Sequence, residues 1–205
     1  KFTHPLRNLI RKINVSDERK NDIWGFAFNP THVAGVQVFF QAILNQNLLV
    51  NVFMESKDFI INAINAYKIT NLSSTPTFYR LLLPLNQSFD SVTKITIGGE
   101  KSDNYLISQV EKYFPNARIN NVYGSTETGP LFSSQNDEFI VQDKHLCLVK
   151  IAEAELYIHK NLFGETSQLN LVDDFYATGD LIEWIDDKQR RFRFTSRKNE
   201  LINVG

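Results

Sequence analysis

Two polar, glycine-containing segments have residue types that could bind a phosphorylated ligand. Residues 121–129 read NVYGSTETG, in which Tyr123 precedes small hydroxyl residues and one carboxylate, Glu127, and residues 98–100 read GGE. Glycines let the backbone approach a ligand closely, hydroxyl and N–H groups suit phosphate oxygens, and a carboxylate can hold Mg²⁺ bridged to phosphate. Because Gly, Ser and Thr are also common turn residues, an ordinary surface loop is the alternative interpretation of these segments.

A third pair of polar segments lies near the end of the sequence. Residues 176–180 read YATGD and precede a strand-like run, and residues 196–200 read SRKNE and follow another. The charged loop between the two runs, residues 186–190, predicts a hairpin. Taken alone, Asp180 could be an ordinary turn carboxylate and Arg197 a solvated partner of Glu200.

The elements that must position these residues alternate regularly before residue 130. We expect strands at 23–28, 47–53, 69–74, 94–97 and 117–123, and helices at 5–13, 32–44, 59–67, from 75 onward and at 104–114. Thr75 and Ser102 are suitable helix caps. Helices of about ten residues between strands imply right-handed crossovers and a mostly parallel sheet. Ligands bind beyond the carboxyl ends of such strands, which is where GGE and NVYGSTETG fall.

After residue 130 the pattern changes to short strand-like runs, at 138–141, 146–151, 155–159, 181–185 and 191–196. The predicted fold class is therefore α/β, a doubly wound and mostly parallel sheet followed by a smaller antiparallel β subdomain. The expected division is residues 1–130 and residues 131–205.

Composition excludes several function classes. The 205 residues include 22 basic and 23 acidic side chains, so no electrostatic footprint for a nucleic-acid partner is visible. Cys147 is the only cysteine and the four histidines lack metal-ligand spacing, which argues against a disulfide framework or a Cys-rich metal site. The uncharged stretch Ile23–Met54 is interrupted by Asn29-Pro30 and studded with amides, which predicts buried elements rather than a membrane span. A cytoplasmic location fits best.

The polar segments, in their order along the sequence, resemble the motifs of the adenylate-forming superfamily. This superfamily includes acyl-CoA synthetases, luciferase-like enzymes and peptide-synthetase adenylation domains. YGSTETG is similar to the Y-G-x-T-E motif, YATGDL to Y-x-T-G-D, and SRKNELINVG to G-R-x-x-D-x-I-x-x-x-G. IGGE is similar to the G-G-E element, and FNPTHVAG to the P-x-x-H-x-x-G segment near the acyl pocket.

The resemblance implies a role for each matching residue of the first two motifs. Tyr123 would stack on adenine beside Gly124 and Ser125, Thr126 would contact the α-phosphate, and Glu127 would ligate Mg²⁺. Thr126 and Glu127 are thus the expected catalytic residues.

The remaining motifs imply the rest of the site. Gly99 and Glu100 would shape the base and acyl end of the pocket, Asp180 would accept hydrogen bonds from the ribose hydroxyls, and Arg197 would bind ribose or phosphate nearby. His32, Gly35 and Gly98 would line the acyl pocket, and Asn199 would be the hinge. From the residues alone, His32 could equally be a helix N-terminal residue that packs on the sheet.

The function that the resemblance implies is ATP-dependent activation of a carboxylic acid to an acyl-adenylate, with ATP/AMP and Mg²⁺ as cofactors. Coenzyme A or a carrier-protein thiol would accept the acyl group, and no membrane partner is expected. The alternative is a non-catalytic nucleotide- or acyl-binding relative. The family's phosphate loop and C-terminal lysine domain have no match in residues 1–205, so we expect this segment alone to be inactive. Ser196 and Asn199 also depart from the usual residues of the hinge motif.

Overall fold

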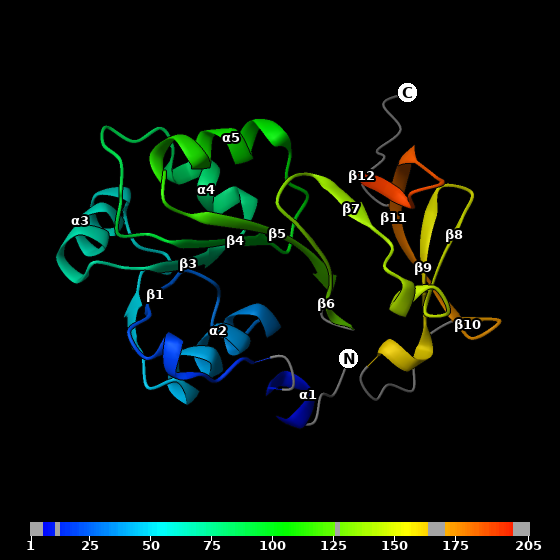
Figure 1. Cartoon of the computed structure of the whole chain (residues 1–205), viewed down its shortest axis with the longest axis horizontal. Helices are drawn as coiled ribbons and strands as arrows, with labels where there is room; N and C mark the ends of the chain where they lie inside the picture. Colours follow the sequence, from blue (N-terminus) through cyan, green and yellow to red (C-terminus); the bar gives the residue numbers. More distant parts are fainter. Residues whose placement is uncertain (1–5, 11–12, 126–127, 164–170, 199–205) are drawn as a thin grey trace. The chain divides into compact units, whose positions relative to one another are not determined.

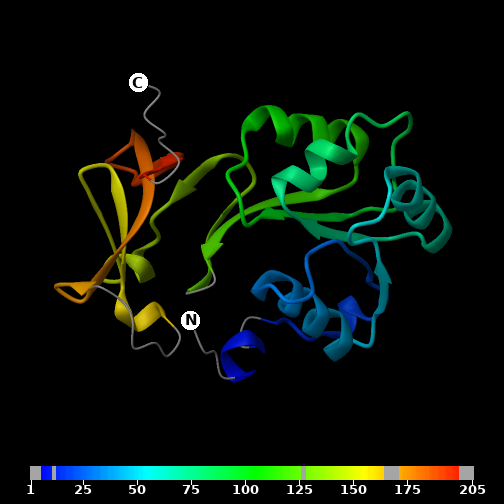
Figure 2. The same cartoon turned by 180° about the vertical axis from the view of Figure 1, so that it is seen from behind.

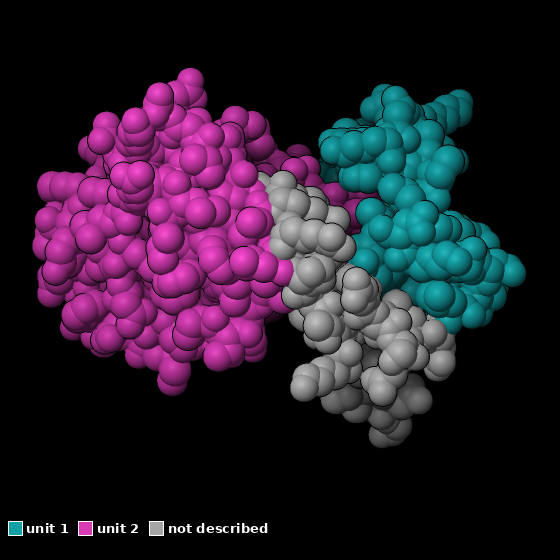
Figure 3. All heavy atoms as spheres, turned by 90° about the horizontal axis from the view of Figure 1, so that it is seen from below, with its two compact units in different colours: residues 1–4, 137–205 teal, residues 5–136 magenta. Residues whose placement is uncertain are grey.

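The structure, a computed structural model, describes residues 6–10, 13–125, 128–163 and 171–198. The chain forms two compact units, one of Pro5–Asn136 and one that consists mainly of Asp137–Gly205, coloured separately in Figure 3. Each unit contains its own sheet. In the described part of the chain, no helix has both the length and the apolar character needed to cross a membrane.

The larger unit is built on a six-stranded sheet with the order β2-β1-β3-β4-β5-β6. The first five strands are parallel, and β6 is antiparallel to β5. The strands are β1 (Ile23–Phe26), β2 (Leu48–Asn51), β3 (Asn71–Ser74), β4 (Lys94–Gly98), β5 (Arg118–Ser125) and β6 (Gly129–Ser134). The predicted parallel sheet is confirmed, whereas β6 had no counterpart among the expected strands.

Helices cover both faces of this sheet, and the strand order explains which helix lies on which face. The chain moves from β1 outward to β2, then returns across β1 to β3 and continues to β4 and β5 in the opposite direction. Because crossovers between parallel strands are right-handed, this reversal places the first crossover helix on one face and the later ones on the other. Figures 1 and 2 show α2 (Val33–Leu44) apart from α3 (Lys57–Tyr67), α4 (Pro76–Leu82) and α5 (Asn104–Tyr113). The short α1 (Leu6–Ile10) lies beside α2.

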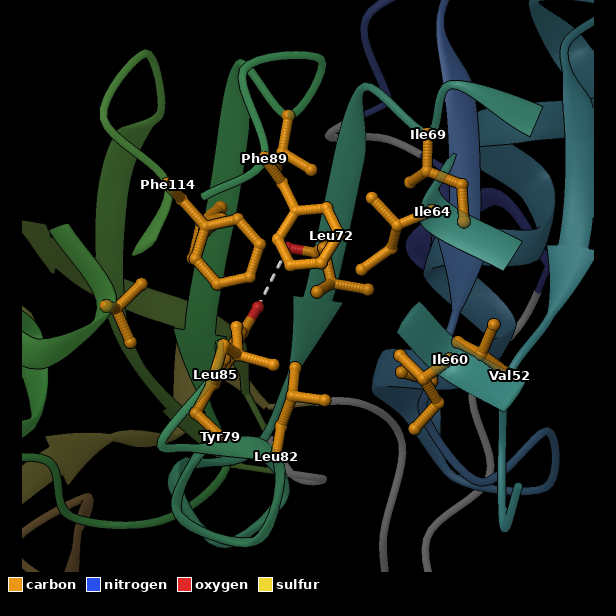
Figure 4. Close-up of a cluster of buried hydrophobic side chains, with 14 of the residues drawn as sticks. Val52, Ile60, Ile64, Ile69, Leu72, Tyr79, Leu82, Leu85, Phe89 and Phe114 are labelled. Carbon is orange, nitrogen blue, oxygen red and sulfur yellow. Dashed lines mark hydrogen bonds between the residues drawn. The ribbon is translucent and has the colours of Figure 1, made fainter. Parts of the chain in front are cut away.

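The main core lies between the sheet and the three later helices, and Figure 4 shows part of it. Tyr79 of α4 is fully buried there, and its hydroxyl donates to the carbonyl oxygens of Leu72 (3.0 Å) and Thr96 (3.2 Å). Burial raises the pKa of Tyr79, which keeps this hydroxyl protonated as a donor. These bonds attach α4 to β3 and β4, whose carboxyl ends carry candidate site residues. A smaller cluster that contains Phe26, Phe28 and Val38 packs α2 against the other face.

Two local expectations about helix beginnings had different outcomes. The Thr75 hydroxyl accepts a hydrogen bond from the Phe78 amide (3.2 Å), so its predicted role as a cap is confirmed. The prediction for Ser102 was wrong, because Asp103 caps α5 by accepting from the Leu106 amide at 2.7 Å. A carboxylate is a stronger acceptor than a hydroxyl, and Asp103 stands directly before the first helical residue.

The smaller unit is an antiparallel sheet of order β7-β12-β11-β9-β8, with β10 paired to β11. Its strands are β7 (Glu138–Ile140), β8 (Val149–Ala152), β9 (Glu155–His159), β10 (Leu171–Val172), β11 (Phe175–Asp186) and β12 (Arg191–Arg197). Phe139 and Phe192 are buried on one face and pack with Phe194. The predicted fold class, doubly wound α/β followed by antiparallel β, is confirmed.

Candidate functional site

The carboxyl ends of β3, β4 and β5 bring three candidate segments together in the larger unit. Ser74 is in register with Ile97, and Gly98 is in register with Val122. Thr75, Gly99 and Tyr123 therefore follow one another along a single edge of the sheet. This is the arrangement expected of a ligand site in an open α/β sheet.

The YGSTETG segment joins β5 to β6, and its described residues at the two strand ends lie close together. A Cβ on Gly124 would lie 2.6 Å from the carbonyl oxygen of Gly129, so only glycine fits there. The Ser125 and Thr128 hydroxyls are 3.2 Å apart, and Thr128 Oγ1 donates to the Gly129 carbonyl at 2.9 Å. These contacts fix both ends of the turn, while Thr126 and Glu127 between them lie outside the described residues.

Tyr123 and Gly98 have different relations to this edge. The Tyr123 ring is half-buried and lies 6.0 Å from the Phe132 ring, centroid to centroid, across β5 and β6. Gly98 is buried as the last residue of β4, and a Cβ there would lie 3.1 Å from the Val122 carbonyl oxygen. Gly98 therefore allows close pairing of the two strands, and Tyr123 offers an aromatic ring beside the turn.

The GGE segment is tied to the beginning of α4. Gly99 has a φ of +85°, a conformation that favours glycine. Glu100 Oε2 accepts hydrogen bonds from the Thr77 amide (3.1 Å) and the Thr77 hydroxyl (2.5 Å). The Glu100 carboxylate thus shapes the loop by anchoring it to the helix, a contact that sequence reasoning did not anticipate.

The expected acyl-pocket residues of the P-x-x-H-x-x-G segment lie at the beginning of α2, after β1. His32 is the N-cap residue with an exposed side chain that makes no capping bond. It follows the strand where the direction of the strand order reverses, which is the usual binding position in such sheets. Gly35 is buried, and a Cβ there would lie 2.1 Å from the Asn29 carbonyl oxygen, so glycine is required for α2 to pack against the preceding turn.

In the smaller unit, Asp180 and Arg197 are paired across β11 and β12. They are partners in the strand register, and Arg197 Nε lies 3.3 Å from Asp180 Oδ1. YATGD had been expected before a strand, but it lies within β11, where residues 178–180 form a bulge opposite β9. The Thr178 hydroxyl donates to the Leu156 carbonyl (2.8 Å) and accepts from the Asp180 amide (3.0 Å), which holds the bulge closed.

Sequence reasoning missed Glu155, a buried carboxylate of β9 beside this bulge. It is 2% exposed and accepts hydrogen bonds from the Gly179 amide (2.8 Å), Lys198 Nζ (2.5 Å) and the Tyr157 hydroxyl (3.3 Å). Burial by itself would raise the pKa of Glu155, but the bonds from Lys198 and Gly179 outweigh it and hold the pKa below its usual value. The only signal in the sequence is an acid directly before the hydrophobic run Leu156–Ile158.

No group of three His, Cys, Asp or Glu side chains able to hold a metal ion occurs among the residues that the structure describes. The predicted Mg²⁺ ligand, Glu127, and the predicted hinge, Asn199, both lie outside them. The described hydroxyls closest to Glu127 in the sequence are those of Ser125 and Thr128, oxygen ligands of the hard type that Mg²⁺ prefers.

The motifs at the ends of β4 and β5 and on β11 and β12 are those expected of an adenylate-forming protein. Sequence comparison gives the same class. The family of AMP-binding enzymes matches residues 2–166. Because this is most of the 205 residues, the chain belongs to the AMP-binding enzyme family, and the resemblance to the adenylate-forming superfamily is confirmed.

Individual relatives agree with this family. A 2-succinylbenzoate–CoA ligase of Staphylococcus epidermidis is 26% identical over 208 residues, an alignment that covers 91% of this chain and 43% of that ligase. Bacitracin synthase 3 of Bacillus licheniformis is 38% identical over 69 residues, which are 33% of this chain and 1% of that protein. The chain therefore spans less than half the length of the ligase.

Solved structures share the fold. An O-succinylbenzoate coenzyme A synthetase from Bacillus subtilis, in complex with ATP and magnesium, superimposes with a TM-score of 0.71 at 16% identity, covering 100% of this chain and 48% of that one. The luciferase-like enzyme of the mealworm Zophobas morio gives a TM-score of 0.71 at 18% identity, covering 98% and 55%.

Proposed function

We propose that the protein containing this chain activates a carboxylic acid with ATP. A carboxylate oxygen of the acid attacks the α-phosphorus, a new P–O bond forms, and pyrophosphate leaves with its bonding electrons, giving an acyl-adenylate. A thiol then displaces AMP from the acyl carbon. Both reactants in the first step are anions, so the protein must align them and neutralise charge. The observation that carries the proposal is the neighbouring position of GGE and YGS at the ends of β4 and β5, in a chain of the AMP-binding family.

In the larger unit, the roles follow from the chemistry of the turn between β5 and β6. The Tyr123 ring would stack on adenine, and Ser125 and Thr126 would donate to the α-phosphate. Glu127 would hold Mg²⁺, which supplies positive charge beside the phosphates when bound. The close approach of Gly124 to the Gly129 carbonyl supports this assignment because it restricts the backbone beside Tyr123 and Ser125.

In the smaller unit, we assign Asp180 to the ribose hydroxyls and Arg197 to the ribose or phosphate beside them. A carboxylate can accept hydrogen bonds from two hydroxyls at once, and guanidinium is suited to phosphate oxygens. The Asp180–Arg197 pair supports the assignment, since it puts an acceptor and a cation on adjacent strands.

The acid is proposed to be aryl or medium aliphatic, because the expected acyl-pocket residues other than His32 are small, uncharged glycines. Residues 23–54, which include α2, contain no Lys or Arg that could neutralise a second carboxylate. The 2-succinylbenzoate ligase is named for a dicarboxylic acid, so the two classes of acid are the ones to compare. Coenzyme A or a carrier-protein thiol is the proposed acceptor.

The test is to detect the intermediate itself. The full-length protein would be incubated with ATP, Mg²⁺ and a panel of monocarboxylic and dicarboxylic acids, and the products analysed by mass spectrometry. We expect an acyl-AMP from at least one acid and a thioester when coenzyme A is added. AMP binding without any acyl-AMP would favour the alternative, a non-catalytic nucleotide-binding relative.

A further inference from the structure

The carboxylate of Glu155 connects the two motifs that carry Asp180 and Arg197, one motif on each oxygen. Oε1 accepts from the Gly179 amide at 2.8 Å, and Oε2 accepts from Lys198 Nζ at 2.5 Å. Gly179 precedes Asp180, and Lys198 follows Arg197. A single buried side chain of a third strand is therefore bonded to the direct neighbour of each residue.

On β11, Glu155 accepts the hydrogen bond of a backbone amide, that of Gly179, which lies in the bulge of the strand. Ala177 pairs with Tyr157 and Leu181 pairs with Glu155, so β11 advances four residues while β9 advances two. The additional residues form the bulge, in which Gly179 has a φ of +76°. Its amide lies between the paired residues of β11 and donates to Glu155 Oε1 at 2.8 Å. Because a backbone donor without a partner is costly, Glu155 fixes the conformation of the bulge.

On β12, the same carboxylate holds the end of the strand. Arg197 is the last residue of β12, and its guanidinium is more than half exposed. Strand ends are less constrained than strand interiors because one side of the ladder is missing. The bond from Lys198 to the buried Glu155 supplies an anchor directly after Arg197.

We propose that Glu155 is the positioning residue of the ribose site. Through Gly179 it sets the direction of the Asp180 carboxylate, and through Lys198 it keeps Arg197 opposite Asp180. This inference rests on the proposed binding of ribose by Asp180. Glu155 itself makes no contact with the nucleotide in this account, so its loss is felt through Asp180 and Arg197.

The experiment measures how well the full-length protein distinguishes AMP from 2′,3′-dideoxy-AMP. Calorimetry would give Kd for both nucleotides with the wild type, Glu155→Ala, Lys198→Met and Lys198→Arg. Glu183→Gln is the matched control, because Glu183 pairs with Arg193 (3.0 Å) across the same two strands, away from the bulge. Circular dichroism would establish that each variant is folded at the temperature used.

We expect Glu155→Ala to weaken AMP binding at least about tenfold, the usual effect of losing a hydrogen bond to a charged group, and to weaken dideoxy-AMP binding clearly less. Lys198→Met should weaken AMP binding about threefold, as for a half-exposed ion pair, whereas Lys198→Arg and Glu183→Gln should match the wild type. If Glu155→Ala does not fold, the inference is tested with the two Lys198 variants, by the same ratio of Kd for AMP and dideoxy-AMP.

Two results would overturn the inference. One is a folded Glu155→Ala variant whose ratio of Kd for the two nucleotides equals that of the wild type. If Glu155→Ala does not fold, the same result for Lys198→Met counts instead. The other is an equal loss for both nucleotides, which would mean a general structural role. A wild type that binds AMP and dideoxy-AMP equally would instead contradict the proposed role of Asp180, which separates that failure from this one.

Discussion

Arg197 Nε lies 3.3 Å from Asp180 Oδ1, and the two residues are partners in the register of β11 and β12. The carboxylate is 18% exposed and the guanidinium 54%, so the acid is the more enclosed member of the pair. A bulge on one strand and a strand end on the other meet at this point. We propose that this pair binds the ribose of the nucleotide.

Asp180→Ala should therefore weaken nucleotide binding in a ribose-dependent way. The substitution removes a charged acceptor for two hydroxyls, and we expect AMP affinity to fall about ten- to a hundredfold. The substitution should not lower the affinity for 2′,3′-dideoxy-AMP, because the sugar of that nucleotide has no hydroxyls that could bond to Asp180. Calorimetry measures both affinities.

The control for this prediction is Asp187→Ala, which removes an exposed carboxylate from the hairpin between β11 and β12. It should leave both affinities unchanged. An equal loss of AMP and dideoxy-AMP affinity in Asp180→Ala would indicate that Asp180 only supports the fold, for example by holding Arg197.

Glu127→Gln should slow formation of the acyl-adenylate in the full-length protein by at least about 10²-fold, as the loss of a positioned electrostatic group does. Binding of the acid should change little, because Glu127 is assigned to Mg²⁺ and phosphate. Pyrophosphate exchange measures the rate, and Glu153→Gln, which neutralises an exposed turn residue, is the control. A wild-type rate for Glu127→Gln would rule out the metal assignment.

The stability contributed by Glu155 should depend on pH with a defined sign. Hydrogen bonding holds its pKa in the folded protein below the unfolded value of about 4.3. Its contribution is therefore complete above that value and is lost as pH falls through the folded pKa. The bond to Glu155 likewise raises the pKa of Lys198, so on the alkaline side the contribution is lost only as pH rises through that raised pKa.

Urea unfolding of the wild type and Glu155→Gln at pH 7 and pH 3 would test this. We expect a difference in unfolding free energy of about 1.5–3 kcal/mol at pH 7, the range for a hydrogen bond to a charged group, and a smaller difference at pH 3. A difference that stays the same at both pH values would mean that ionised Glu155 is not the stabilising form.

Monocarboxylic acids should be better substrates than dicarboxylic acids of the same size. A second carboxylate near α2 would meet no cation from residues 23–54, and an unpaired charge is expensive to remove from water. We expect kcat/KM to be at least about tenfold higher for the monocarboxylate. Each factor of ten corresponds to about 1.4 kcal/mol of the cost of removing the unpaired carboxylate from water. A dicarboxylate with the highest kcat/KM in the panel would overturn the assignment of the acid.

Local patterns were sufficient to predict most of the architecture. The alternation of strands and helices before residue 130 predicted the parallel sheet, because hydrophobic runs and helix caps such as Thr75 act over a few residues. The motif YATGD shows the limit of this reasoning. It contains a strong turn signal, Thr178-Gly179-Asp180, yet β11 continues through it because β9 and β12 pair with the residues on both sides.

Contacts between distant residues were beyond sequence reasoning. Glu155 is 43 residues from Lys198, and nothing local indicates that the two meet. The buried Asp22 is a similar case, since it accepts from Lys94 Nζ at 3.0 Å and from Asn71 Nδ2 at 3.1 Å at the amino ends of β1, β3 and β4. Such pairs depend on strand order and register, which a single sequence does not determine.

Exchange of labelled pyrophosphate into ATP by the full-length protein would show whether it forms an acyl-adenylate. We expect exchange that requires Mg²⁺ and a carboxylic acid, because pyrophosphate can return to ATP only from an acyl-adenylate. Exchange without an acid, or none with any acid of the panel while AMP still binds, would contradict it.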